Sequence, residues 1–313
     1  MTTDSTGTPR TIAEYLDQLR AALRGADPAL IQDALYDAEE HLRAELAEQP
    51  GRSEADMLAR VVGSYGAPEE VAEIYRDQEV KIQRAMRPPL PPKRRSTVGR
   101  FFGVAADPRT YSALFYMLLS LATGVFYFAW ATTGISLSFG LAVLIIGIPF
   151  IVLFFGSVRV LSLVEGRMVE SMLGVRMPRR PSFSTRGMSL WKRIGTMFSD
   201  PRSWSTLFYM LMMLPLGIVY FTFTVTLIAV SLAFTLAPLI KLVAVASGIH
   251  DTCDDGPAWV CNGVLWLDGW PGSFVLCILG VLLLFTTLHI VRGLGHMHGL
   301  MAKHLLVTGT AKE

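Results

Sequence analysis

The chain has 313 residues, of which 51% are apolar and only 17% are charged, whereas soluble globular domains carry roughly 25% charged residues. Three stretches contain no Asp, Glu, Lys or Arg, namely residues 110–158, 203–240 and 269–291. Each is longer than the ~20 residues that cross a bilayer as a helix. Strands of a membrane barrel would alternate every second residue, so these runs exclude a barrel. We therefore predict an all-α membrane protein.

Charge is segregated along the chain although the net charge is only +2. Residues 1–82 hold 17 acids and 8 bases (net −9), while residues 83–112 (7 bases, 1 acid) and 159–204 (9 bases, 3 acids) each have a net charge of +6. Basic loops mark the cytoplasmic side. We expect both termini and the 159–204 loop in the cytoplasm, and the Asp-rich 248–271 loop on the outer side of the membrane. The polar start predicts no cleavable signal peptide.

Residues 11–82 have the pattern of four short helices, after a disordered tail over residues 1–10. Thr11 and Ser53 are typical N-caps, Asp27-Pro28 is a typical helix start, and Pro68 opens the fourth helix. The apolar residues recur at helical spacing between these signals. The sequence thus predicts a small, acidic four-helix module.

Three segments of this module carry a family resemblance. They read YLDQLRAAL, ALYDAEEHLRAEL and SYGAPEEVAEIY, the last covering residues 64–75. The pattern resembles the bacterial HAAS signalling domain, and its Gly-x-Pro-Glu-Glu-Val element is the most specific part. The resemblance implies a helical module of membrane proteins that is often encoded beside PadR-type transcription regulators.

The acidic surface of the module indicates the kind of partner that it could bind. A net charge of −9 should repel nucleic acid and anionic lipid, so a basic protein surface is the expected partner. We take Glu39, Glu40 and Glu45 as candidate partner-binding residues. A Pro/Arg-rich linker over residues 83–104 separates the module from the rest of the chain. The basic residues of the linker would either bind anionic lipid headgroups or only determine the membrane topology.

Residues 105–313 contain an internal repeat. Asp107-Pro108-Arg109 recurs as Asp200-Pro201-Arg202, at an offset of 93, together with the following Leu-Phe-Tyr-Met. A second set of matches has an offset of 133 and aligns Arg159 with Arg292. We therefore predict a four-helix transmembrane bundle built from a duplicated two-helix unit, with crossings near 112–133, 137–158, 206–229 and 272–291. We expect the additional residues of the second half to form an extracytoplasmic insertion, 230–271. Its first part, 230–247, would be re-entrant, interfacial or extracytoplasmic.

The repeat also resembles a known family. The pattern DPR-x-x-x-x-LFYML, the VR-x-L-x-x-x-x-G-x-M extension and the insertion in the second half are similar to the sensor domain of bacterial membrane histidine kinases. In those kinases, dimerisation and ATP-binding domains follow the last helix. Here the sequence stops at Glu313, so the resemblance implies a sensor without the kinase.

The helix that leaves each repeat half is a candidate route for a signal. Leu161, Val164, Met168 and Met172 form an apolar stripe beside Glu165, Arg167 and Glu170. The pattern predicts an interfacial amphipathic helix. Arg159 and Arg292 stand at equivalent helix exits, where they would either reach headgroups or position the two extensions in a signal relay.

The insertion concentrates the residues that could bind a ligand. Cys253 and Cys261 are spaced for a disulfide in an oxidising compartment, with two free thiols as the alternative. Tryptophans and acids of the same segment would form either an interfacial anchor or a pocket for a cationic amphiphile. These candidate ligand-binding residues are Asp254, Asp255, Trp259, Trp266, Asp268 and Trp270.

The sequence contains no nucleotide-binding or hydrolytic motif, so we expect no enzyme, no cofactor and no metal site. The leading hypothesis is a non-catalytic sensory or regulatory membrane protein that relays an envelope signal to a cytoplasmic partner, such as a PadR-like regulator. A homo-oligomer is compatible with this role. The alternatives are a transporter or permease and a scaffold subunit of a membrane assembly.

Overall fold

The computed structural model describes residues 8–48, 51, 53–86, 96–141, 147–178, 195, 200–247 and 270–308. No strand occurs in these residues, and helices form most of them. The chain divides into two compact units. Unit 1 comprises residues 1–90, 130–211 and 298–313, and unit 2 comprises residues 91–129 and 212–297. The predicted all-α fold is confirmed for the part of the chain that is described.

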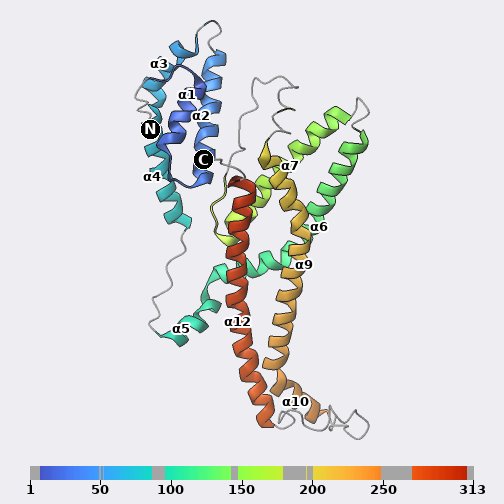
Figure 1. Ribbon diagram of the computed structural model, residues 1–313. Helices are drawn as coiled ribbons and strands as arrows, with labels where there is room; N and C mark the ends of the chain where they lie inside the picture. The colour runs from blue at the N-terminus through green and yellow to red at the C-terminus, as the bar shows by residue number, and fades with distance from the viewer. Residues whose placement is uncertain are drawn as a thin grey trace, which may run out of the picture. The chain divides into compact units, whose positions relative to one another are not determined.

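The amino-terminal module consists of α1 (Ile12–Ala22), α2 (Pro28–Glu48), α3 (Glu54–Tyr65) and α4 (Pro68–Met86) (Figure 1). Local signals start these helices, because the Thr11 and Ser53 side chains accept hydrogen bonds from the backbone N–H groups of Glu14 and Asp56. Gly66 ends α3 at φ +111°, a conformation that favours glycine. The four predicted helices of this region are therefore present.

The module has its own apolar core, which every one of its helices supplies. The core residues are Ile12, Tyr15, Leu19, Leu23, Ala34, Ala38, Leu42, Met57, Leu58, Val61, Val71 and Ala72. Tyr15 is fully buried, and its hydroxyl donates to the Gly66 carbonyl at 2.9 Å, which ties α1 to the α3–α4 turn. A core of this kind stabilises the helices through burial rather than through helix propensity.

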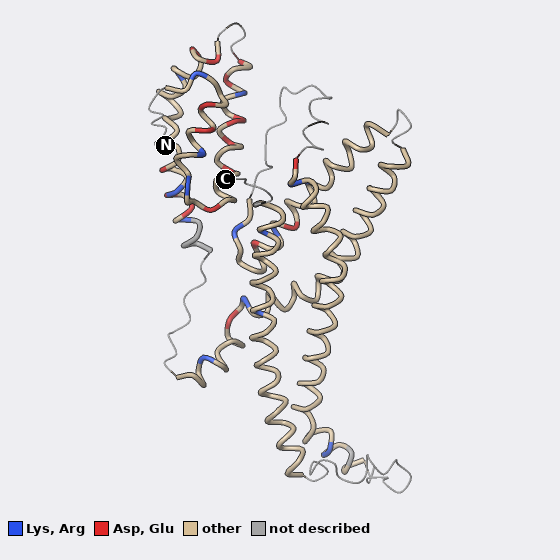
Figure 2. Tube along the Cα trace, in the orientation of Figure 1, with Lys and Arg blue, Asp and Glu red and all other residues tan. Residues whose placement is uncertain are grey.

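The rest of the described chain is dominated by four long apolar helices, α6 (Pro108–Leu141), α7 (Gly147–Leu173), α9 (Pro201–Thr235) and α12 (Trp270–Lys303). Each is long and apolar enough to cross a membrane. Charged residues gather in α1–α4 and are sparse along the long helices (Figure 2). Large apolar side chains such as Phe139 (77% exposed) and Leu153 (72%) face outward, as lipid contact requires. The protein is thus a multi-pass membrane protein with four crossings in its described part.

Shorter elements complete the described chain, namely α5 (Thr97–Phe102), the 3₁₀ turn η1 (Gly103–Ala106), α10 (Ala237–Ala246) and the π-helical turn η2 (His304–Thr308). Helix α9 runs past residue 230, the predicted start of the insertion, and ends at Thr235. Pro238 lies in the first turn of α10, where a proline is tolerated.

Candidate functional site

One buried arginine joins the amino-terminal module to the segment that follows α7. Arg176 Nε lies 3.2 Å from Glu79 Oε2 of α4, Nη2 lies 3.2 Å from Asp33 Oδ2 of α2, and Nη1 lies 3.1 Å from Glu170 Oε1 of α7. Nη1 also donates to the Met177 carbonyl oxygen at 2.8 Å. All three guanidinium nitrogens therefore have acceptors, a pattern that only arginine can supply. We name these four side chains the Arg176 cluster.

The local sequence explains how Arg176 reaches Glu170. Gly174 ends α7 with φ +70°, and its N–H donates to the Glu170 carbonyl oxygen at 3.2 Å. This left-handed C-cap reverses the chain at no steric cost, since glycine has no Cβ. The two residues after Gly174 then lead the chain back past the last turn of α7.

The Arg176 cluster is buried, so the loss of one of its charges is costly in free energy. The four side chains are only 6–10% exposed. Burial on its own lowers the pKa of the Arg176 guanidinium, but the carboxylates of Glu79, Glu170 and Asp33 act in the opposite direction and the pKa is raised overall. Removing one partner of a buried ion pair typically costs 3–5 kcal/mol, because the other charge stays buried without compensation. The cluster is thus a point at which a single substitution should disturb the module.

Two further contacts of unit 1 join the module to other helices. Lys303, the last residue of α12, donates to Asp27, which precedes α2. Arg202 of α9 donates to Gln32 of α2 at 3.1 Å. Lys303 and Glu170 are equivalent positions at the repeat offset of 133. Lys303 contacts the module directly, whereas Glu170 acts through Arg176, which contacts Asp33 and Glu79 of the module.

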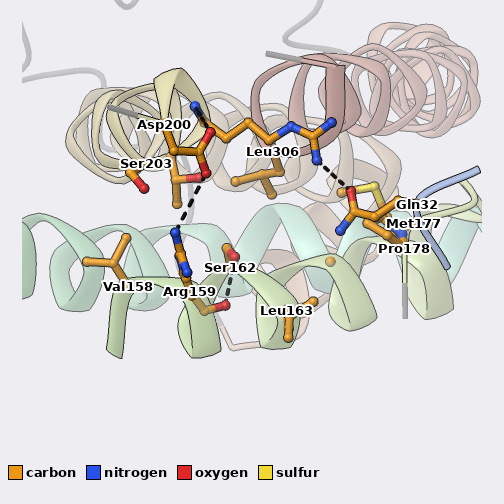
Figure 3. Close-up of a pocket in the computed structure, with 13 residues that line it drawn as sticks. Gln32, Val158, Arg159, Ser162, Leu163, Met177, Pro178, Asp200, Ser203 and Leu306 are labelled. Atoms are coloured by element: carbon orange, nitrogen blue, oxygen red, sulfur yellow. Dashed lines mark hydrogen bonds and ion pairs between the residues drawn. The ribbon is translucent and has the colours of Figure 1, made fainter. Parts of the chain in front are cut away.

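A small polar cavity lies beside these contacts (Figure 3). It is lined by residues of α2, α7, α9 and η2, including Gln32, Arg159, Asp200 and Arg202. Across it, Arg159 Nη2 lies 3.7 Å from Asp200 Oδ2, and Figure 3 shows the two side chains pointing toward one another. The volume is about 50 Å³, room for about three water molecules. A cavity of this volume is far smaller than the roughly 300–1,000 Å³ that is typical of pockets for organic ligands.

The predicted relay residues Arg159 and Arg292 both form ion pairs. In unit 2, Arg292 Nη1 lies 2.9 Å from Asp107 Oδ2. Asp107 and Asp200 also cap α6 and α9, since they accept from the backbone N–H groups of Arg109 and Arg202 at 3.0 and 3.1 Å. Each arginine therefore pairs with the capping aspartate of the other repeat half.

A second buried polar group connects three long helices of unit 1. The hydroxyl of Tyr209 in α9 donates to Glu165 Oε1 of α7 at 2.8 Å and lies 3.2 Å from His298 Nε2 of α12. All three residues are about 1% exposed. Glu165 and His298 are equivalent positions at the offset of 133. Buried ionisable groups in membrane helices are costly and mark functional sites by default.

Two acids of the predicted amphipathic stretch of α7 are buried. Glu165 and Glu170 are 1% and 5% exposed, whereas Val164 of the apolar stripe is 47% exposed. The acids face inward because Tyr209 and Arg176 supply their hydrogen-bond donors, and Val164 faces outward because lipid accepts apolar side chains. The acids therefore make contacts inside the protein.

The structure places the three candidate partner-binding acids on α2. Glu39 pairs with Arg43 at 2.8 Å and Glu45 pairs with Arg60 at 3.4 Å. Glu39, Glu40 and Glu45 are all half-buried rather than fully exposed. Their binding role stays a prediction, and two of the three acids have a structural role within the module as well.

Most of the ligand-binding candidates lie outside the described residues. These are Cys253, Cys261, Asp254, Asp255, Trp259, Trp266 and Asp268. Trp270 is described, as the first residue of α12, and is 43% exposed. Within the described ranges, no group of three or more His, Cys, Asp or Glu side chains could hold a metal ion.

Sequence reasoning did not single out the Arg176 cluster. Arg176 is one of nine bases in residues 159–204, and its partners Asp33 and Glu79 are 143 and 97 positions away. The repeat did contain a usable signal for the second group, because the offset of 133 aligns Glu165 with His298 and Glu170 with Lys303. Aligned polar residues on otherwise apolar helices point to buried partners.

Two family comparisons match the chain in the expected order. The profile of the family described as "Putative sensor" matches residues 116–306, more than half of the chain. The HAAS profile matches residues 14–74. No curated protein and no solved structure gave a significant match. Both family resemblances of the sequence are therefore confirmed, and HAAS domains generally mediate protein–protein interaction.

Proposed function

Because this chain belongs to the "Putative sensor" family and also carries a HAAS domain, we propose that it is a non-catalytic membrane sensor that relays an envelope signal to a cytoplasmic protein. The family matches support a signalling role in general. The candidate partner is a PadR-like regulator, an identity that rests on the HAAS resemblance alone.

The Arg176 cluster is the observation that carries this proposal. It joins α2 and α4 of the HAAS domain to α7, one of the apolar helices, through charge pairs 3.1–3.2 Å long. A displacement of α7 along or about its axis would move Glu170 and Arg176, and with them the acceptors on the module. Signals that act on the membrane helices therefore have a short physical route to the module.

The charge distribution supports a protein of the bacterial inner membrane whose amino-terminal module lies on the cytoplasmic side. The basic segments 83–112 and 159–204 flank apolar helices, and such segments are retained on the cytoplasmic side. Single cysteines introduced at positions 262 and 309 of a protein without native cysteines test this topology. We expect membrane-impermeant labelling of intact cells at 262 only. Labelling of 309 would contradict the four-crossing arrangement with cytoplasmic termini.

Deletion of residues 1–82 tests the relay itself. The full chain and the truncated chain are expressed separately in the same strain and purified in detergent. The proteins that co-purify with each chain are then compared. We expect the truncated protein to reach the membrane but to lose partner recruitment. The triple change E39K/E40K/E45K should weaken recruitment more than the triple change E69K/E70K/E73K on α4. The loss of recruitment caused by E39K/E40K/E45K should become smaller as the salt concentration rises. Normal recruitment by the truncated chain would refute the relay.

A transporter is the second candidate, and the buried group formed by Tyr209, Glu165 and His298 is the observation that favours it. Proton pathways use such groups within membrane helices. Against this reading, Glu165 lies within the last third of α7 rather than near its middle. Proteoliposomes with a pH-sensitive dye distinguish the two roles, since a transporter should dissipate a pH gradient and a sensor should not. The present observations carry no argument for the scaffold alternative.

A further inference from the structure

The module contains a groove that the contacts described above do not use. It lies between α1 and the carboxyl-terminal half of α2 and extends to the start of α3, with a volume of about 820 Å³. Ile12, Leu16 and Leu46 contribute apolar surface at its base, where Leu16 and Leu46 are partly buried against the module core. The volume lies within the range of 300–1,000 Å³ that is typical of binding pockets.

The rim of the groove is acidic. Glu39, Glu48 and Glu54 line it, with Arg43 as the only base among the lining residues. Glu39 is paired with Arg43, and Glu54 accepts the N–H of Ile12 at 3.2 Å. Glu48 is exposed at the end of α2. Three carboxylates and one guanidinium give the groove a formal charge of −2.

We propose that this groove binds an amphipathic helix of another protein, one whose apolar face is flanked by lysines or arginines. The proposal rests on the proposed function, because it specifies the surface through which the module would bind its partner. Helix-in-groove recognition uses apolar anchors at i, i+3, i+4 and i+7. The apolar base accepts these anchors, and the acidic rim attracts the flanking bases while it repels an acidic helix.

Helix α2 connects this groove to the Arg176 cluster. Asp33 of the cluster lies near the start of α2, and Arg43 and Glu48 of the groove lie near its end. At 1.5 Å per residue, Asp33 and Arg43 are roughly 15 Å apart along the helix. A helix bound in the groove therefore does not compete with Arg176 for the carboxylates of the cluster. The groove and the Arg176 cluster therefore lie at opposite ends of the same helix, α2.

Fluorescence anisotropy with a labelled peptide tests the proposal. The probe is a short Leu/Lys peptide with leucines at i, i+3, i+4 and i+7, and the comparison peptide carries Glu in place of Lys. The full-length protein is used in nanodiscs of zwitterionic lipid, with empty nanodiscs as background. E48K changes the rim, and E73K makes the same charge change at an exposed position of α4. A47R obstructs the groove, and A59R adds the same side chain at an exposed position of α3.

We expect the Leu/Lys peptide to bind and the Leu/Glu peptide not to bind. E48K should weaken binding by about five-fold at low salt, which corresponds to about 1 kcal/mol, the upper end of the range for an exposed charge pair. A47R should weaken it by more than about ten-fold, because arginine fills space that the anchors need. E73K and A59R should change affinity by less than about two-fold.

Four outcomes would overturn the proposal. Equal binding of both peptides would show that charge does not select the occupant. Equal losses for E48K and E73K, or for A47R and A59R, would show that binding is not in the groove. Absence of binding of the Leu/Lys peptide would show that the groove does not accept a basic amphipathic helix. Normal partner recruitment by A47R, with loss on deletion of 1–82, would refute the groove and leave the relay intact.

Discussion

Arg159 pairs with Asp200, the aspartate that caps the first helix of the other repeat half. The converse pair also exists, because Arg292 of the second half pairs with Asp107 of the first. These four residues are equivalent at offsets of 93 and 133. If the halves are those of the predicted repeat, each aspartate caps the first helix of its own half and pairs with the arginine of the other half.

The two pairs should differ in strength. Arg159 and Asp200 are 21% and 15% exposed, whereas Arg292 is 49% exposed. Screening by solvent makes an exposed pair weak. In double-mutant cycles with R159Q/D200N and R292Q/D107N, we expect coupling near 1 kcal/mol for the first pair and less than about 0.5 kcal/mol for the second. Asparagine retains the N-cap, so thermal unfolding in detergent isolates the ion pair. Equal coupling would contradict this ranking.

Two glycines form a reciprocal helix crossing in unit 2. A Cβ added at Gly124 of α6 would overlap the carbonyl of Met213 in α9, and a Cβ added at Gly217 would overlap the carbonyl of Ser120 in α6. The pairs 120 and 213, and 124 and 217, share the offset of 93. Small residues of this kind let membrane helices approach closely.

G124A and G217A should each lower the free energy of unfolding in detergent by roughly 1–3 kcal/mol, because a backbone carbonyl cannot move aside as a side chain can. G293A in α12 is the control, since a Cβ there meets nothing within 4 Å. We expect it to be neutral or stabilising, as alanine is the better helix former. If all three variants unfolded alike, the close approach of α6 and α9 would be refuted.

The sequence predicts the helices better than their orientation. Caps such as Thr11 and Ser53, and charge-free runs of membrane-spanning length, are local signals, and the structure confirms the helices that they predict. The exposure of Glu165 and Glu170 is not a local property, since it depends on Tyr209 and Arg176. A helical wheel assigns acids to water when no partner is known. It therefore fails where distant donors bury them.

The hydroxyl of Tyr209 should be essential to the buried group. Y209F removes the hydroxyl that donates a hydrogen bond to Glu165 Oε1 at 2.8 Å. A buried carboxyl group that loses its hydrogen-bond partner typically costs about 1–3 kcal/mol or more. Y111F is the matched control, because Tyr111 donates to the Ala105 carbonyl at 2.8 Å but is 52% exposed. We expect a lower melting temperature in detergent for Y209F and little change for Y111F. A Y209F protein as stable as Y111F would mean that Glu165 does not depend on this donor.

Arg176 should be irreplaceable even by lysine. R176Q leaves Asp33, Glu79 and Glu170 buried without the guanidinium, and a loss of this kind typically costs 3–5 kcal/mol. R176K keeps the charge but cannot present three nitrogens in one plane, so it should recover only part of the loss. The measurement is hydrogen–deuterium exchange of the full chain in nanodiscs, read at peptides from α2, α4 and α7.

Faster exchange in these three helices is expected for R176Q, an intermediate rate for R176K, and wild-type rates for R167Q. Arg167 is the appropriate control because it also pairs with Glu170, at 3.8 Å, but is 52% exposed. Its loss removes a weak, screened pair and leaves the buried contacts in place. If R176Q loosened only the segment after α7 and left α2 and α4 unchanged, the module would not depend on the cluster. The relay would then need another route, through Lys303 and Asp27.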